Sequence, residues 1–180
     1  MDALLATPKS RRSLLAATVF AAAVSAARAQ APAPVFGAGY IEPSVAWPVA
    51  KARAIALRKL QSARCQRLFA DFRDLAGRPL HDVLAARNET AEEHFSRMIF
   101  RDGSGVTPCG PPRVFAFTTS GSSTVFVCPT FHQLMRESKA TGANLLIHEQ
   151  LHSLGAGEAP SPGLMTSYQI TSSVEWRCGS

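Results

Sequence analysis

The sequence predicts an α+β domain in which a small, partly antiparallel sheet lies between an N-terminal helical half and a helix near the C-terminus. Residues 49–75 are rich in Ala, Leu, Arg and Lys, with apolar residues at helical spacing. Two runs of β-forming residues, 114–119 and 124–128, flank a Ser-Gly turn, and 144–154 is helical again. The 180 residues, 46% of them hydrophobic, suffice for one domain, which we expect to span 49–180.

The N-terminal segment is expected to lie outside this domain. Residues 1–29 have the pattern of a cleaved signal peptide, with an apolar run at 14–26 and a small-x-small cleavage site at 27–29. The apolar run is shorter than the roughly 20 residues of a spanning helix, so no stable membrane insertion is expected after cleavage. Residues 30–48 contain several prolines and are expected to form an extended arm.

This leader predicts an exported protein, located in a bacterial periplasm or outside the cell. The Arg11-Arg12 pair resembles a twin-arginine export signal, and the general secretory route is the alternative. The net charge of +6 owes several positive charges to this leader. Beyond it the charges alternate in sign without a basic run, so nucleic acid is not an expected partner.

The cysteine content agrees with export. An even number of cysteines in a small exported domain predicts two disulfides. No Cys-x-x-Cys pair is present, which argues against a thiolate zinc site. Three connectivities are open for the four cysteines, which are Cys65, Cys109, Cys128 and Cys178.

Shorter signals complete the order of elements. Gly77-Arg78-Pro79 ends the first helical region, and further helices are expected over 80–86 and from Thr90. Residues 101–105 are typical of a turn, after which the hairpin follows. Gly155 and Gly157 stop the helix over 144–154, and a last helix is expected from about Ser167.

The chemistry lies in the segment His148-Glu149-Gln150-Leu151-His152. Residues four apart on a helix are neighbours, so His148 and His152 can bind one metal ion, and two imidazoles suit zinc. Glu149 lies about 100° around the helix, where it can act as general base toward a zinc-activated water. The pattern therefore predicts zinc as cofactor and metal-assisted hydrolysis as reaction.

A third ligand is expected just beyond the helix. Gly155 can adopt backbone angles that other residues avoid, so the chain can turn back sharply and present the carboxylate of Glu158. Catalytic zinc sites hold three protein ligands and keep one position open. The expected set is therefore His148, His152 and Glu158.

The segment 148–158 resembles the zinc-binding motif of zincin metallopeptidases, in particular the elongated metzincin form. The chain is similar as well to small uncharacterised bacterial exported proteins with a Leu-Ile-His-Glu-x-Leu-His-Ser-Leu-Gly-x-Gly-Glu core. Residues 163–168 resemble the Met-turn, with Met165 at its methionine. The resemblance implies a zincin-like fold, zinc held by His148 and His152, and Glu149 as catalytic base. The third metzincin ligand is usually His or Asp, where this chain has Glu158.

Two further roles and two rival functions stay open. Tyr168 is a candidate oxyanion stabiliser, and strand 124–128 could pair with the backbone of a peptide or protein substrate. One rival is a non-catalytic exported domain with a closed structural zinc, which could recruit His132 as fourth ligand. The other is a disulfide-stabilised interaction module without metal.

Overall fold

The structure is a computed structural model that describes residues 39–179, all of which lie in the compact unit Val35–Ser180. The predicted signal peptide at 1–29 and residues 30–38 of the predicted arm lie outside the described residues. The elements are, in chain order, η1 (Pro43–Val45), α1 (Ala46–Leu60), α2 (Ala63–Gln66), α3 (Leu68–Asp71), α4 (Leu80–Ala86), α5 (Ala91–Arg97), β1 (Ile99–Asp102), η2 (Thr107–Cys109), β2 (Ala116–Thr118), β3 (Thr124–Val127), α6 (Phe131–Glu137), α7 (Lys139–Ser153) and α8 (Ser167–Cys178).

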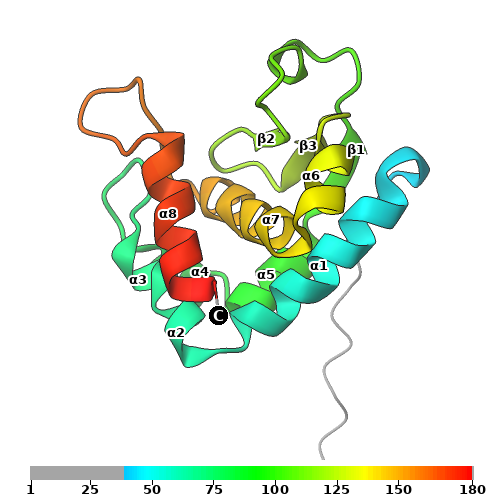
Figure 1. Ribbon diagram of the computed structural model, residues 1–180. Coiled ribbons are helices and arrows are strands. Elements are labelled where there is room, and N and C mark those ends of the chain that lie inside the picture. The colour runs from blue at the N-terminus through cyan, green and yellow to red at the C-terminus, as the bar shows by residue number, and fades with distance from the viewer. Residues whose placement is uncertain (1–38, 180) are drawn as a thin grey trace, which may run out of the picture. The chain divides into compact units, whose positions relative to one another are not determined.

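The sheet has three strands in the order β1-β3-β2, so the predicted α+β class is confirmed (Figure 1). The hairpin is antiparallel as predicted, with Phe117 opposite Phe126. β1 pairs in parallel with β3, with Phe100 opposite Val125. β3 is therefore paired on both sides, and β2 is an edge strand. Of the three strands, β2 lies at one edge of the sheet and β1 at the other.

The N-terminal helical region differs from the prediction of one long helix over 49–75. α1 starts at Ala46, inside the predicted arm, and ends at Leu60. The side chain of Ser62 then accepts a hydrogen bond from the backbone N–H of Cys65 and starts the short helix α2. Such a cap satisfies a free N–H group of a new helix, which favours a break at this point. Before α1, Ile41 bridges to Phe100, so this part of the arm lies beside β1.

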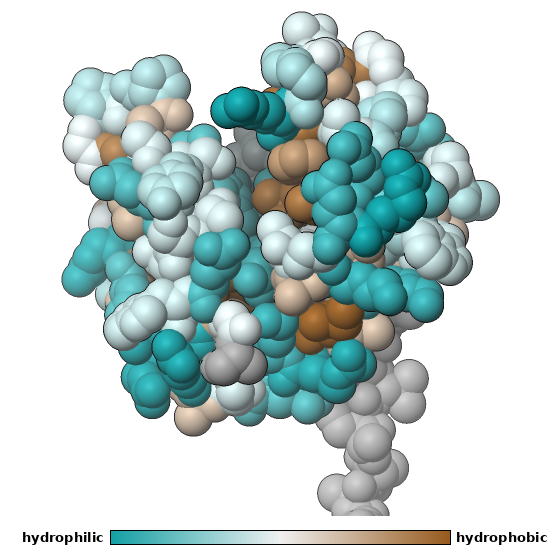
Figure 2. Space-filling model, viewed as in Figure 1, coloured by the Kyte–Doolittle hydropathy of each residue, from teal (hydrophilic) through white to brown (hydrophobic). Residues whose placement is uncertain are grey.

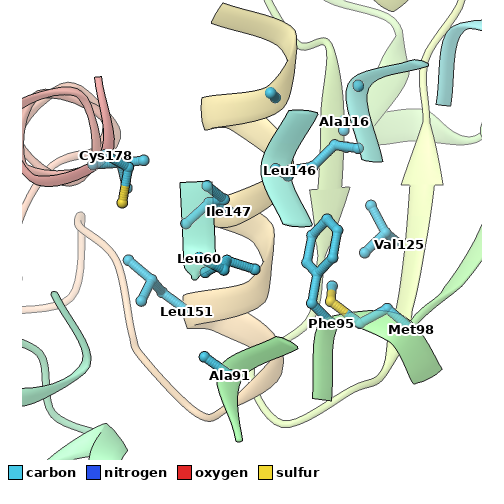
Figure 3. Close-up of a cluster of buried hydrophobic side chains, with 14 of the residues drawn as sticks. Leu60, Ala91, Phe95, Met98, Ala116, Val125, Leu146, Ile147, Leu151 and Cys178 are labelled. Carbon is cyan, nitrogen blue, oxygen red and sulfur yellow. The ribbon is translucent and has the colours of Figure 1, made fainter. Parts of the chain in front are cut away.

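α7 carries the His-Glu segment through the centre of the core, where it contacts α1, α8, α6 and β2. Its apolar residues Leu146, Ile147 and Leu151 are fully buried. Figure 3 shows them among side chains from α1, α5 and β3 that include Leu60, Phe95 and Val125. The side chain of Ser138 caps α7 by accepting from the N–H of Thr141, so the helix starts earlier than the predicted residue 144. The central position holds α7 rigidly.

Two disulfides select one of the three connectivities. Cys65 in α2 bonds to Cys178 at the end of α8, and Cys109 in η2 bonds to Cys128 after β3. Disulfides persist in oxidising compartments, so the protein belongs outside the reducing cytoplasm. Within residues 39–179, none of the helices combines the length and apolar character needed to cross a bilayer.

Candidate metal centre

Three predicted side chains converge at the C-terminal end of α7. His148 Nε2 lies 2.9 Å from His152 Nε2, and Glu158 Oε2 lies 3.1 Å from His152 Nε2 and 3.4 Å from His148 Nε2. Two ligands at about 2.0–2.1 Å from a tetrahedral zinc ion are about 3.3 Å apart. The structure thus brings the three predicted ligands together at nearly the spacing that one metal ion needs.

Hydrogen bonds at the far side of each ring orient the imidazoles. His152 Nδ1 lies 2.9 Å from the carbonyl oxygen of Ala156, which can only accept, so Nδ1 carries the ring proton. His148 Nδ1 lies 3.0 Å from the hydroxyl of Thr171 in α8. The second nitrogen of a ligating histidine is normally held by such a partner, which fixes the tautomer and leaves Nε2 as the donor atom.

The charges of the cluster fit a cation. Burial lowers the pKa of His148, and the neighbouring His152 acts in the same direction, so the neutral ring is favoured. The hydrogen bond with His148 is the main cause that lowers the pKa of Glu158, so this carboxyl is ionised. Two imidazole Nε2 atoms and a carboxylate oxygen within hydrogen-bonding distance of one another need a proton or a metal cation between them to offset their repulsion. The donor set therefore fits a divalent metal ion.

Glu149 lies beside this cluster but not in it. Its side chain is buried, and its Oε2 has no hydrogen-bond partner among the described residues. Burial, assisted by the charge of Glu158, raises the pKa of Glu149 to about 8, although the backbone of Thr118 in β2 acts in the opposite direction. A buried carboxyl with a raised pKa and a free oxygen, facing a cleft, is typical of a general acid or base.

The turn that delivers Glu158 depends on glycine, as predicted. Gly155 has φ = +110°, and an added Cβ would lie 3.0 Å from the Cβ of Asp74. The turn is also held from outside, because Leu75 N–H donates to the Gly155 carbonyl and Asp74 bridges to Ala156. Glu158 is therefore positioned by a sharp turn packed against the loop between α3 and α4.

Replacing Gly155 with Ala is expected to lower the free energy of unfolding by about 1–3 kcal/mol, because the residue would keep a left-handed φ and crowd Asp74. Gly163→Ala is the matched control, since Gly163 also has a positive φ of 77° but nothing lies near its added Cβ. Urea denaturation of both variants measures the effect. Equal destabilisation of the two would contradict the role of crowding at Asp74.

The cluster opens into a cleft of about 1000 Å³. One wall is formed by α8, and the opposite wall by β2 and the segment before it, between which Figure 2 shows the surface hollowed. The cleft is lined largely by apolar residues, among them Val114 and Phe115 before β2, Leu134 of α6 and Leu145 of α7. Volume and lining are those of a ligand-binding site.

The remaining candidates lie at different distances from the centre. Tyr168 lines the cleft but is 81% exposed, at the start of α8. His132 is in α6 and stacks on Trp47, with 5.6 Å between ring centroids, so it is no fourth ligand in this structure. Met165, the methionine of the segment that resembles the Met-turn, is 39% exposed and does not pack in the core.

Sequence reasoning missed the residues that hold the ligands in place. Thr171 belongs to α8, whereas His148 belongs to α7. Asp74 belongs to the loop between α3 and α4, which is distant in sequence from the turn at Gly155. A signal for Thr171 existed, since it occurs at helical spacing from Ser167 and Tyr168, which also line the cleft. Nothing in the local sequence around Asp74 indicates its contact with the turn.

The site defines a class: two buried histidines and a half-buried carboxylate, beside a buried carboxyl with one unpartnered oxygen, open to an apolar cleft. Compared with known proteins, the chain matches no family model, no curated protein and no solved structure.

Proposed function

We propose that the protein is an exported zinc-dependent hydrolase of the metallopeptidase type. The observation that carries the proposal is the convergence of His148, His152 and Glu158 at metal-ligand spacing beside the buried Glu149. Three protein ligands that leave a position open toward a cleft are the arrangement of catalytic zinc sites, of which two histidines and a glutamate are one established set. The resemblance of 148–158 to the zincin motif supports the same reading.

Each residue has a distinct part in this chemistry. A bound zinc ion polarises a carbonyl oxygen and lowers the pKa of water. Glu149 is proposed to take a proton from the attacking water and later to deliver it to the leaving amine, because its buried carboxyl lines the cleft beside the cluster. Tyr168, at the cleft, is proposed to donate a hydrogen bond to the developing oxyanion. Thr171 keeps the ring of His148 oriented.

The cleft favours a peptide or protein substrate. β2 is the edge strand and lines the cleft, so its free backbone groups can pair with an extended chain. The prediction that strand 124–128 would do this is wrong, because β3 is paired on both sides by β1 and β2. The apolar wall suits substrate side chains that are themselves apolar.

Zinc per chain, measured by elemental mass spectrometry on the oxidised protein, is the direct test. About one equivalent is expected in the wild type. His152→Ala is expected to lose the metal, and Glu158→Ala is expected to bind it at least about tenfold more weakly, since one charged ligand of three is removed. His132→Ala is the matched control and should bind zinc like the wild type, because His132 lies outside the cluster.

The rival functions predict different results. A protein that takes up no zinc near neutral pH would be an interaction module held by its disulfides. Zinc loss in His132→Ala would indicate a closed structural site. Iron in place of zinc would point to oxygen chemistry, because two histidines and a carboxylate also form the facial triad of non-haem iron enzymes.

A further inference from the structure

The face of α7 that points away from the metal ligands carries buried polar residues. Gln150 and Ser153 are fully buried. The His-Glu-x-x-His pattern at 148–152 requires neither of these residue types. With 100° per residue, Gln150 lies roughly opposite the two histidines on the helix. Most buried polar side chains have at least one hydrogen-bond partner, as Gln150 has at Nε2 although not at Oε1. The partners of Gln150 and Ser153 lie in α5 and the residues just before it.

The contacts form a continuous chain of hydrogen bonds. Ser153 Oγ lies 2.7 Å from His94 Nε2, and His94 Nδ1 lies 2.9 Å from Glu89 Oε2. Glu89 Oε1 lies 2.7 Å from Nη2 of Arg97. Beside this chain, Gln150 Nε2 donates to the carbonyl oxygen of Ala91 at 2.7 Å. α5 and the residues just before it thus hold α7 at Gln150 and Ser153, which lie on either side of His152 in the sequence.

The order Glu89-His94-Ser153 is that of a hydrolytic triad, but the geometry excludes this role. Ser153 is fully buried, His94 is 4% exposed, and neither lines the cleft. A nucleophile needs access to a substrate carbonyl. Burial is also the main cause that lowers the pKa of His94, against the opposing effect of Glu89. The group therefore acts within the protein rather than on a substrate.

We propose that Glu89, His94 and Ser153 are positioning residues that fix the rotation of α7, so that His148 and His152 meet Glu158 at metal-binding distance. The role rests on the proposed zinc centre. An imidazole nitrogen lies several ångströms from the helix axis, so a rotation of about 10° moves it by about 1 Å. Functional constellations tolerate displacements of only about 0.5 Å. A buried chain of hydrogen bonds resists such a rotation, because turning the helix would leave its members unpartnered.

Zinc affinity of Ser153→Ala, measured by competition with a chromophoric chelator, tests the proposal without an activity assay. We expect the dissociation constant to rise about tenfold, the lower end of the effect of residues that support metal ligands. Ser96→Ala is the matched control, since Ser96 is a buried serine of α5 without a hydrogen bond to α7 among the described residues. The control should bind zinc like the wild type. Glu89→Gln, a milder change at a less buried position, should give a smaller loss and serves if Ser153→Ala does not fold.

A spectroscopic readout separates positioning from general stability. With Co²⁺ in place of zinc, the visible absorption bands of Ser153→Ala should shift relative to those of Ser96→Ala, because ligand geometry has changed. Unchanged affinity and unchanged bands in a folded Ser153→Ala or Glu89→Gln would overturn the positioning role alone. A wild type that binds neither Zn²⁺ nor Co²⁺ would overturn the proposed function and this role with it.

Discussion

Glu149→Gln is expected to lower the rate of peptide hydrolysis about 10²–10⁴-fold, the usual contribution of a general base, while zinc stays bound. Glutamine keeps the size of the side chain but cannot accept a proton from water. Zinc should remain because the proposed ligands are His148, His152 and Glu158, and Glu149 is not among them. Turnover of a quenched-fluorescent peptide library, together with zinc per chain, measures both parts of the expectation.

A control isolates the role of this one carboxylate. Glu175→Gln makes the same chemical change at an exposed position of α8 that does not line the metal cleft, and should leave turnover unaltered. If Glu149→Gln retained full activity with zinc bound, another base would have to be sought. If it lost zinc as well, Glu149 would be a ligand and the assignment of Glu158 would be in error.

Removal of the Cys65–Cys178 disulfide, by replacing both cysteines with Ala, is expected to lower the free energy of unfolding by about 5 kcal/mol. This bond joins residues 113 apart, so it constrains a large part of the unfolded chain. Removal of Cys109–Cys128, whose residues are 19 apart, is expected to remove only about 3 kcal/mol. Both cysteines of the first pair are buried between α2 and α8, which adds a packing loss.

Urea denaturation of the two double variants under non-reducing conditions tests this order. The pair with the shorter loop is the matched comparison, since each double variant loses the same two sulfur atoms. A larger loss from the shorter loop would show that contacts in the native state, rather than the entropy of the unfolded chain, dominate the effect.

Local signals in the sequence predicted most elements because they depend on neighbours in the chain. The helix from Thr90, the hairpin and the helix from Ser167 were predicted from short patterns, and the structure confirms them. The break between α1 and α2 at Ser62 was missed. A serine in an alanine-rich run can lie inside a helix or cap a new one, and the local sequence does not show which of the two occurs. The parallel pairing of β1 with β3 was also not predicted, since it joins residues distant in sequence.

The candidate site shows the same division. Helix geometry alone predicted that His148 and His152 lie together with Glu149 beside them. The conformational freedom of glycine predicted the turn at Gly155. The residues that hydrogen-bond to α7 come from other helices: Thr171 from α8 and His94 from α5. No periodicity links these residues to the motif, because only the packing of α7 against its neighbours makes them adjacent.

The three converging ligands all come from one short stretch, 148–158, and this has a consequence for folding. Closing so short a loop costs little chain entropy, so an unfolded chain could still chelate zinc weakly through the same stretch. A metal that also binds the unfolded state raises the melting temperature by less than its affinity for the native state implies. The thermal shift on adding zinc is therefore expected to understate how tightly the folded protein holds the ion.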